Sequence, residues 1–315
     1  MRVALDLLGG DHAPDAVIDG ALLAVARDPS VEVVLVGPPD LAAALLSARG
    51  AVLPVVAATE SVAMDEDPAR GVRAKRDATV RVIHRLVREG SANGGADAAV
   101  SVGPTGAVLA GAVLTLGRLT TRPAVAAVLP TPRGDVVLLD VGATSDSTPE
   151  QLAAQAVAGS AYAAVLGVAE PRVGLLNVGA EPGKGDQLRR DAYALLERAP
   201  VRFVGNVEGH DVIQGGPADV VVTDGFTGNV LLKGIEGALL AQDPHRELSR
   251  AALLLGVDGL SVVGHGASRA EDVAAIVLQA AALARDGLMP RLRTALTAHG
   301  ASSKPAPKAP SKAAS

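Results

Sequence analysis

Eight apolar runs in this chain end abruptly in clusters of glycine with Asp, Asn, Thr, Glu or His. The runs are rich in β-branched residues and nearly continuous, as at 31–36, 136–141 and 220–222. Strands that are buried on both faces of a parallel sheet have this pattern. In an open α/β sheet, ligands bind in the crevice beyond the carboxyl ends of the strands. The pattern therefore predicts a mostly parallel sheet with its polar chemistry gathered at one edge.

Stretches of helical period fill most gaps between the predicted strands. Strands are expected near residues 3–8, 31–37, 97–103, 124–130, 135–142, 172–178, 201–206, 218–224 and 259–264. Helices are expected at 15–27, 40–48, 105–117, 188–198, 229–241 and 269–286. The best-marked helix start is Thr148-Pro-Glu-Gln151, which has a hydroxyl cap, proline at the first helical position and a capping-box glutamine. This alternation indicates a three-layer α/β/α fold.

One pair of strands breaks the alternation. The link at 131–134 is too short for a parallel crossover, so the strands at 124–130 and 135–142 are predicted to form an antiparallel hairpin within the sheet. Residues 1–300 are predicted to form a single α/β domain. Residues 301–315 contain only Ala, Ser, Lys and Pro, which predicts a disordered tail.

Composition excludes several classes of function. The chain of 315 residues has 1% aromatic residues, no cysteine and a net charge of −5, and three of its lysines lie in the tail. Nucleic-acid binding needs stacking surfaces or a positive net charge, so we expect no nucleic-acid partner. Without cysteine there are no disulfides, thiolate nucleophiles or Cys-ligated metals. No apolar stretch reaches the length of a membrane-spanning helix and no signal peptide is recognisable, so we expect a cytoplasmic protein.

The common cofactor and metal motifs are also missing. The loop at 179–185 resembles a phosphate loop but is one residue short of GxxxxGK and lacks the following Ser or Thr. It can still offer backbone N–H groups and the Lys184 ammonium to a phosphate. No GxGxxG follows the first strand, so the usual dinucleotide-binding motif is missing. No HExxH or other compact set of metal ligands is present, so we expect no metal site.

The segment 222–229 is the strongest single element, because it places a carboxylate at a strand end, followed by glycines, a hydroxyl and an amide that lead into a helix. The plain interpretation is a turn in which Thr227 or Asn229 caps the helix. The functional interpretation adds an anion on the free N–H groups and a proton-transfer role for Asp224. His265, between two glycines, is either an ordinary loop histidine or a catalytic one.

Taken together and in order, these motifs closely resemble the phosphate acyltransferase family of phospholipid synthesis over roughly residues 1–290. The matching segments are Asp6-x-x-Gly9-Gly10-Asp11, Ser101-x-Gly-x-Thr105-Gly106, Leu139-Asp-Val-Gly142, Gly159-Ser-Ala-Tyr162, Val173-Gly-Leu-Leu-Asn177-Val-Gly179, Lys184-Gly185, Gly205-Asn206-Val-Glu-Gly209 and Asp224-Gly-Phe-Thr227-Gly228-Asn229-Val. The chain departs from the family pattern at Pro104 and Thr144. The family's fold is related to those of phosphotransacetylases and isocitrate-dehydrogenase-like enzymes.

The resemblance implies an enzyme that converts acyl-(acyl carrier protein) and inorganic phosphate to acyl phosphate and free carrier protein, for glycerophospholipid synthesis. It implies a homodimer with no organic cofactor, whose product a downstream glycerol-3-phosphate acyltransferase would use. We predict that the catalytic residues are Asp224, Lys184, His265 and Asn229. The predicted substrate- and phosphate-binding residues are Asp6, Gly9, Gly10, Asp11, Thr105, Gly106, Asn206, Thr227, Gly228 and Lys233.

Two surface features bear on partners. Residues 68–89, drawn as one helix, place several arginines on one side and apolar residues on the other, so Arg81, Arg85 and Arg88 are predicted to dock a small acidic carrier protein. A solvated helix face is the alternative interpretation. The family's long insertion, associated with membrane contact, is mostly missing between Gly237 and Ser261, where 248–255 is the only short helix candidate. We therefore expect weak or absent membrane contact.

Two other classes of protein stay open at the level of sequence. A non-catalytic homologue would bind an acyl carrier or acyl phosphate as a scaffold. An isocitrate-dehydrogenase-like enzyme would use a nicotinamide cofactor and a metal-bound hydroxy acid, which requires a cluster of aspartates.

Overall fold

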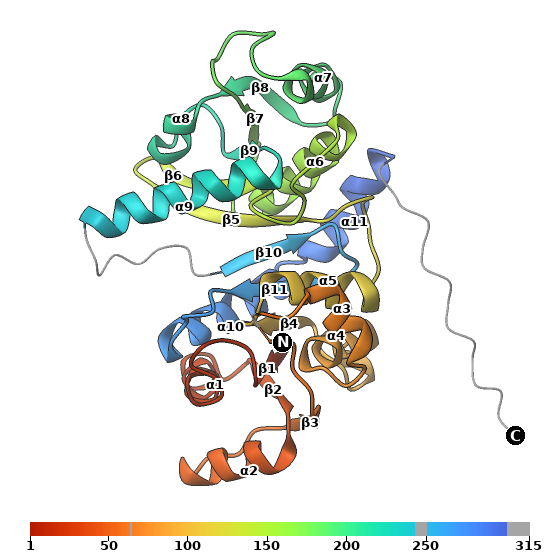
Figure 1. Cartoon of the computed structure of the whole chain (residues 1–315), viewed down its shortest axis with the longest axis vertical. Coiled ribbons are helices and arrows are strands. Elements are labelled where there is room, and N and C mark those ends of the chain that lie inside the picture. The colour runs from red at the N-terminus through yellow and green to blue at the C-terminus, as the bar shows by residue number, and fades with distance from the viewer. Residues whose placement is uncertain (64, 243–250, 301–315) are drawn as a thin grey trace, which may run out of the picture.

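The computed structural model describes residues 1–63, 65–242 and 251–300 (Figure 1). The strands are Arg2–Asp6 (β1), Glu32–Gly37 (β2), Val55–Ala57 (β3), Ala98–Ser101 (β4), Ala124–Thr131 (β5), Gly134–Leu139 (β6), Arg172–Leu176 (β7), Arg202–Val207 (β8), Val220–Val222 (β9), Ala251–Leu255 (β10) and Leu260–Gly264 (β11). The helices are Asp15–Arg27 (α1), Pro39–Ala48 (α2), Pro68–Ala74 (α3), Thr79–Glu89 (α4), Thr105–Thr115 (α5), Pro149–Val165 (α6), Gln187–Leu196 (α7), Gly209–Gln214 (α8), Gly225–Gln242 (α9), Ala270–Arg285 (α10) and Leu288–Ala298 (α11), with a short 3-10 helix at Ser91–Asn93 (η1).

The strands form an 11-stranded sheet in the order β3-β2-β1-β4-β11-β10-β5-β6-β9-β7-β8. Strand β10 is antiparallel to both β11 and β5, and β5 is antiparallel to β6. The remaining neighbours pair in parallel. The predicted hairpin is thus confirmed, but it belongs to a larger antiparallel centre that also includes β10.

Helices cover both faces of this sheet, as the three-layer prediction requires (Figure 1). Buried side chains of α1, α2, α6, α7, α10 and α11 join one large core cluster with every second residue of the strands. Buried side chains of α3, α5, α8 and α9 pack on the opposite face, and α4 covers that face over β1 and β2. Alternate strand residues thus point into different layers, because side chains alternate across a strand.

Local sequence signals place most elements well. Helix α6 begins with the predicted capping box, in which the Thr148 hydroxyl accepts from the Gln151 amide and the Gln151 side chain accepts from the Thr148 amide. The candidate helix at 248–255 is wrong for residues 251–255, which form β10, and its first residues lie outside the described part of the chain. Residues 68–89 form two helices, α3 and α4, instead of one. The predicted tail at 301–315 also lies outside the described residues.

The strand directions correct one expectation about the site. Because β10 is antiparallel to both its neighbours and β5 is antiparallel to β6, strands β6, β9, β7 and β8 run opposite to β3, β2, β1, β4 and β11. The carboxyl ends of these two parallel groups therefore lie at opposite edges of the sheet. The prediction that all polar clusters gather at one edge is wrong.

Among the described residues, no single helix is both long and apolar enough to cross a membrane. Helices α10 and α11 meet that test only as a pair, and they are bent by 58° relative to each other.

Candidate active site

A pocket of about 180 Å³ lies over the central strands, where the start of α5 faces the first half of α9. Its floor includes Ala127 of β5, Ala252 of β10 and Val263 of β11, which pair side by side in the sheet. The pocket brings together four of the predicted site residues, which come from segments far apart in sequence: Thr105, Asn229, Lys233 and His265. Gly142, from the loop after β6, and Glu236 complete its polar rim.

Helix α5 directs its amino end at this pocket. Pro104 is the N-cap residue and offers no side-chain cap, and the amides of Ala107 and Val108 both donate to its carbonyl oxygen. No partner is seen for the N–H groups of Thr105 and Gly106 among the described residues. Free N–H groups at a helix start, together with the helix dipole, form a binding place for an anion. Pro104 is therefore compatible with a helix start at this position.

Helix α9 begins four residues earlier than predicted, and Asp224 is its cap. One carboxylate oxygen of Asp224 accepts from the backbone N–H of Thr227 at 2.9 Å, and the other accepts from the Thr227 hydroxyl at 2.8 Å. The amide of Gly228 donates to the Asp224 carbonyl within the helix. The prediction that Thr227 or Asn229 caps this helix is wrong, and the Gly228 amide is not available to hold a phosphate.

Gly228 instead allows α9 to pack closely on the loop after β6. A Cβ atom there would overlap the carbonyl oxygen of Asp140. Asn229, the next residue, donates from its side-chain amide to the carbonyl oxygen of Val141 at 2.8 Å. Asp140 is buried and accepts from the amides of Val125, Gly142, Ala143 and Thr144 at 2.8–3.0 Å. These contacts hold the loop after β6 and the start of α9 together at one side of the central pocket.

Successive residues of α9 face different pockets. Thr227 and Asn229 are two positions apart, which on a helix turns their side chains about 200° from each other. Asn229 and Lys233 line the central pocket, whereas Thr227 lines a separate pocket of about 670 Å³ on the other side of the helix. The predicted site residues are therefore divided between two pockets: Thr227 lines the larger one together with Gly185, the neighbour of Lys184, and Asn229 lines the central one.

The larger pocket contains the residue that the sequence analysis missed. Arg189 of α7 is buried, and its guanidinium donates to Asp186, to the hydroxyls of Thr223 and Thr227 at 3.1 Å, and to the carboxylate of Asp224. Burial raises the pKa of Asp224, but the hydrogen bonds from Thr227 and the Arg189 guanidinium outweigh burial, so this pKa lies below its ordinary value. Asp224 is therefore ionised at neutral pH. An arginine at the third position of a helix carries no motif, so no sequence signal marked it.

Lys184 and Asn206 also lie away from the central pocket. Lys184 is exposed on the loop after β7, and the Asn177 side chain holds that loop by donating to the Lys184 carbonyl at 3.1 Å. Asn206 is buried at the end of β8, where its side chain donates to the Glu181 carbonyl at 2.9 Å. Both residues thus belong to the edge formed by β7, β9 and β8.

The first predicted cluster lies at the opposite edge. Asp6 is buried and accepts from the Ser101 hydroxyl at 2.7 Å, and burial raises its pKa against the hydrogen bonds that lower it. A Cβ on Gly9 would lie 2.8 Å from the Gly103 amide, so a glycine is needed where these two loops meet. Gly10 has a positive φ of 95°, and the Asp11 amide donates to the Gly266 carbonyl at 2.8 Å. This cluster thereby fixes the loop that carries His265.

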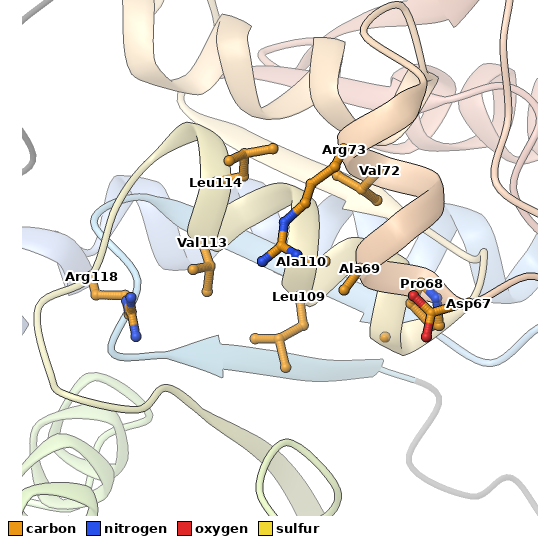
Figure 2. A pocket seen from close by; sticks show the side chains of 11 residues that line it. Asp67, Pro68, Ala69, Val72, Arg73, Leu109, Ala110, Val113, Leu114 and Arg118 are labelled. Atoms are coloured by element: carbon orange, nitrogen blue, oxygen red, sulfur yellow. The ribbon is translucent and has the colours of Figure 1, made fainter.

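The arginines predicted to dock a carrier protein lie on the outer side of α4. Arg85 and Arg88 are exposed and Arg81 is partly exposed, while Val82, Ile83 and Leu86 are buried, as the periodicity predicts. Arg81 donates to the Val72 carbonyl of α3, and Arg88 donates to the Thr115 carbonyl of α5, both at 3.4 Å. The two helices that these arginines contact, α3 and α5, line a groove beside α4 (Figure 2).

The described residues contain no group of three His, Asp or Glu side chains that could hold a metal ion.

The fold is that of the phosphotransacetylases. The structure of EutD phosphotransacetylase from Staphylococcus aureus matches with a TM-score of 0.64 and 15% identity, covering 90% of this chain and 94% of that one. The 4-hydroxythreonine-4-phosphate dehydrogenase from Klebsiella pneumoniae matches with a TM-score of 0.59 and 16% identity, covering 90% and 99%. At these identities the likeness describes the fold alone. The chain thus belongs to the class of proteins with this α/β fold.

Sequence comparison gives the family. Residues 1–243 match the family model described as fatty acid synthesis protein. The phosphate acyltransferase of Heliobacterium modesticaldum is 42% identical, over 95% of this chain and 97% of its own. The phosphate acyltransferase of Desulfitobacterium hafniense (strain DSM 10664 / DCB-2) is 43% identical, over 85% and 89%. The chain belongs to this family and is an acyltransferase, which confirms the family and the enzyme class predicted from its motifs.

Proposed function

We propose that this protein transfers an acyl group from acyl-(acyl carrier protein) to inorganic phosphate, giving acyl phosphate and free carrier protein. One observation carries the proposal: the central pocket joins the start of α5 to a lysine of α9 that makes no ion pair within the described residues. Helix N–H groups and an ammonium are the groups that hold phosphate. The pocket thus supplies an anion site next to a histidine.

The chemistry assigns roles to Lys233, His265 and the start of α5 in this pocket. A phosphate oxygen attacks the thioester carbonyl carbon, the C–S bond breaks, and the carrier leaves as a thiolate that takes up a proton. Lys233 and the N–H groups of Thr105 and Gly106 hold the phosphate, and preorganised donors of this kind are worth roughly 3 kcal/mol each in a transition state. His265 protonates the thiolate.

Residues beside the pocket position these groups. Asn229 holds the loop after β6, and Asp11 holds the loop of His265. Asp224 is ionised, so we assign it to fixing the start of α9 and not to giving a proton to the leaving thiolate. The alternative place for phosphate is the larger pocket, beside Thr227 and the loop of Lys184, where the motifs alone had placed it.

The partners follow from the same proposal. Arg81, Arg85 and Arg88 form an exposed cationic face on a chain of net negative charge, which would steer a small acidic carrier protein toward the enzyme. We further propose a cytoplasmic homodimer without an organic cofactor, whose acyl phosphate serves a downstream glycerol-3-phosphate acyltransferase.

A single assay tests the reaction. The protein is incubated with acyl-carrier protein and phosphate, and acyl phosphate is trapped with hydroxylamine as the hydroxamate. We expect hydroxamate to form only when phosphate and enzyme are both present. Binding of the carrier without hydroxamate would instead favour the scaffold alternative. The dehydrogenase alternative predicts reduction of a nicotinamide cofactor by a hydroxy acid.

A further inference from the structure

The groove between α3 and α5 is an apolar surface beside the cationic face of α4. It holds about 600 Å³ and runs from Pro68 and Gly106 to Arg118 (Figure 2). Its floor is made by Val72 of α3 and by Leu109, Ala110, Val113 and Leu114 of α5. Leu114 is 48% exposed. The α5 residues recur at intervals of three and four, which forms a continuous apolar stripe along one side of the helix.

Positive charge surrounds this apolar floor. Arg73 projects from α3 over the groove, toward the side of Ala110 (Figure 2). Arg81 and Arg88 of α4 bind carbonyl oxygens of the two groove helices. None of these three guanidinium groups forms an ion pair within the described part of the chain. Asp67, the acidic residue of the groove lining, lies at the end where it caps α3.

We propose that this groove seats an acidic, amphipathic helix of the acyl carrier protein, with its apolar side on the α5 stripe and its carboxylates beside Arg73, Arg81 and Arg88. This inference rests on the proposed function, which makes the carrier protein a substrate. Helix-in-groove recognition uses an apolar floor of this kind, and charges at the rim set the partner. Arg73 and Leu114 are thereby assigned to carrier recognition.

Charge and position favour this occupant over others. A symmetric contact between two copies uses the same patch on both, so it would bring two sets of Arg73, Arg81 and Arg88 into one interface. A bare acyl chain would lie under the Arg73 guanidinium without a counter-charge. The groove begins at Gly106, the neighbour of Thr105 in the central pocket, so a carrier seated there places its acyl thioester near the proposed phosphate site.

The test compares two exposed positions in the groove with two exposed positions elsewhere. Arg73→Glu and Leu114→Glu alter the groove. The controls Arg198→Glu and Val52→Glu make one charge reversal and one apolar-to-acidic change just after α7 and in the loop after α2. Each variant is assayed with acyl-carrier protein and with acyl-CoA, which carries the thioester without the protein. Binding of the holo carrier protein is measured separately by calorimetric titration, which does not depend on turnover.

We expect each groove variant to raise KM for acyl-carrier protein, and Kd for the holo carrier, at least about tenfold. Turnover of acyl-CoA should stay within about twofold of wild type, and the control variants should match wild type with both substrates. Unchanged KM and Kd in the groove variants would overturn the assignment, as would equal losses with both substrates.

Other occupants give distinct results that would also overturn it. A lower molecular mass of Leu114→Glu by light scattering would make the groove a contact between copies. Binding of wild type to anionic phospholipid vesicles that Leu114→Glu abolishes, with carrier kinetics unchanged, would make it a lipid-binding surface. A wild-type protein that forms no acyl phosphate from either substrate would refute the proposed function, while the titration would still decide the groove.

Discussion

Arg189 and Asp224 form a buried ion pair beneath the start of α9, with side-chain exposures of 10% and 7%. The pair joins α7 to the strand end of β9, and the two threonine hydroxyls that accept from Arg189 complete its hydrogen bonds. Removal of Arg189 leaves the Asp224 carboxylate buried without an ion-pair partner, which costs more than the pair contributes as a whole. Removal of the Asp224 charge leaves Arg189 paired with Asp186 alone. The pair therefore couples the stability of the fold to the position of α9.

At this residue scale, Asp224→Asn and Arg189→Met should each lower the free energy of unfolding by about 3 kcal/mol. The double variant should lose less than the sum of the two, because the second change removes a group that has already lost its partner in this pair. Turnover of Asp224→Asn should fall at least about 100-fold, since the first turn of α9 shifts. Urea unfolding and steady-state kinetics measure these effects, and additive losses would show that the two groups do not interact.

The pH dependence of this pair has a definite sign. Because the folded-state pKa of Asp224 is lowered, the pair stabilises the fold at neutral pH. That contribution is lost as the pH falls below the ordinary value of 3.8 and through the lower folded value.

At the scale of the elements, a buried histidine links α4 to β11. His84 is fully buried, and because the Val80 carbonyl can only accept, its Nδ1 carries the proton and its Nε2 accepts from the Ser261 hydroxyl at 2.9 Å. Burial lowers the pKa of His84 to about 4. The unfolded chain therefore binds a proton that the folded chain does not, in the interval between about 4 and 6.5.

His84 should consequently destabilise the fold as the pH falls from about 6.5 to about 4, by up to about 3 kcal/mol. His84→Asn keeps a donor near the Val80 carbonyl but does not titrate, so its unfolding free energy should depend less steeply on pH in this interval. Denaturant unfolding of both proteins between pH 4.5 and 7.5 gives the difference. Parallel curves for the two proteins would contradict the account.

Elements marked by local chemistry could be predicted, whereas those fixed by distant partners could not. The capping box of Thr148 and Gln151 predicts the start of α6, and the short connection between β5 and β6 predicts their hairpin. Residues 251–255, by contrast, are short and apolar without β-branching, so they fit a helix or a strand equally well. Pairing with β5 and β11, both far away in sequence, makes them a strand.

The same division holds for the candidate site. The motifs indicate Thr105, Asn229, Lys233 and His265, and the structure brings these into one pocket. Lys184 and Thr227 lie apart from these four residues, and this could not be predicted. The side of α9 that Thr227 faces depends on where the helix starts, and the position of the Lys184 loop depends on the reversal of strand direction at β10. Arg189 was missed because its importance lies in three-dimensional contacts with Thr223, Asp224 and Thr227.

On the scale of the whole molecule, contact with membranes and with a second copy stays a prediction. Leu254 is not on a surface helix but in β10, where it is 2% exposed, so a charge there would disrupt the core and could not report on membrane contact. We expect the protein to stay in the supernatant with anionic liposomes at physiological salt, and to have the mass of a dimer by light scattering. Co-sedimentation that Leu240→Glu on the exposed side of α9 abolishes would contradict this expectation.

The location of phosphate is the central claim, and the whole molecule offers two lysines on opposite sides of α9 to test it. Phosphate saturation curves of Lys233→Ala and Lys184→Ala, measured by hydroxamate formation, compare them directly. We predict that Lys233→Ala lowers kcat/KM for phosphate by about 100-fold, whereas Lys184→Ala changes it by less than about tenfold. A large loss in Lys184→Ala with near-normal phosphate use in Lys233→Ala would place the reaction at the larger pocket and contradict the account.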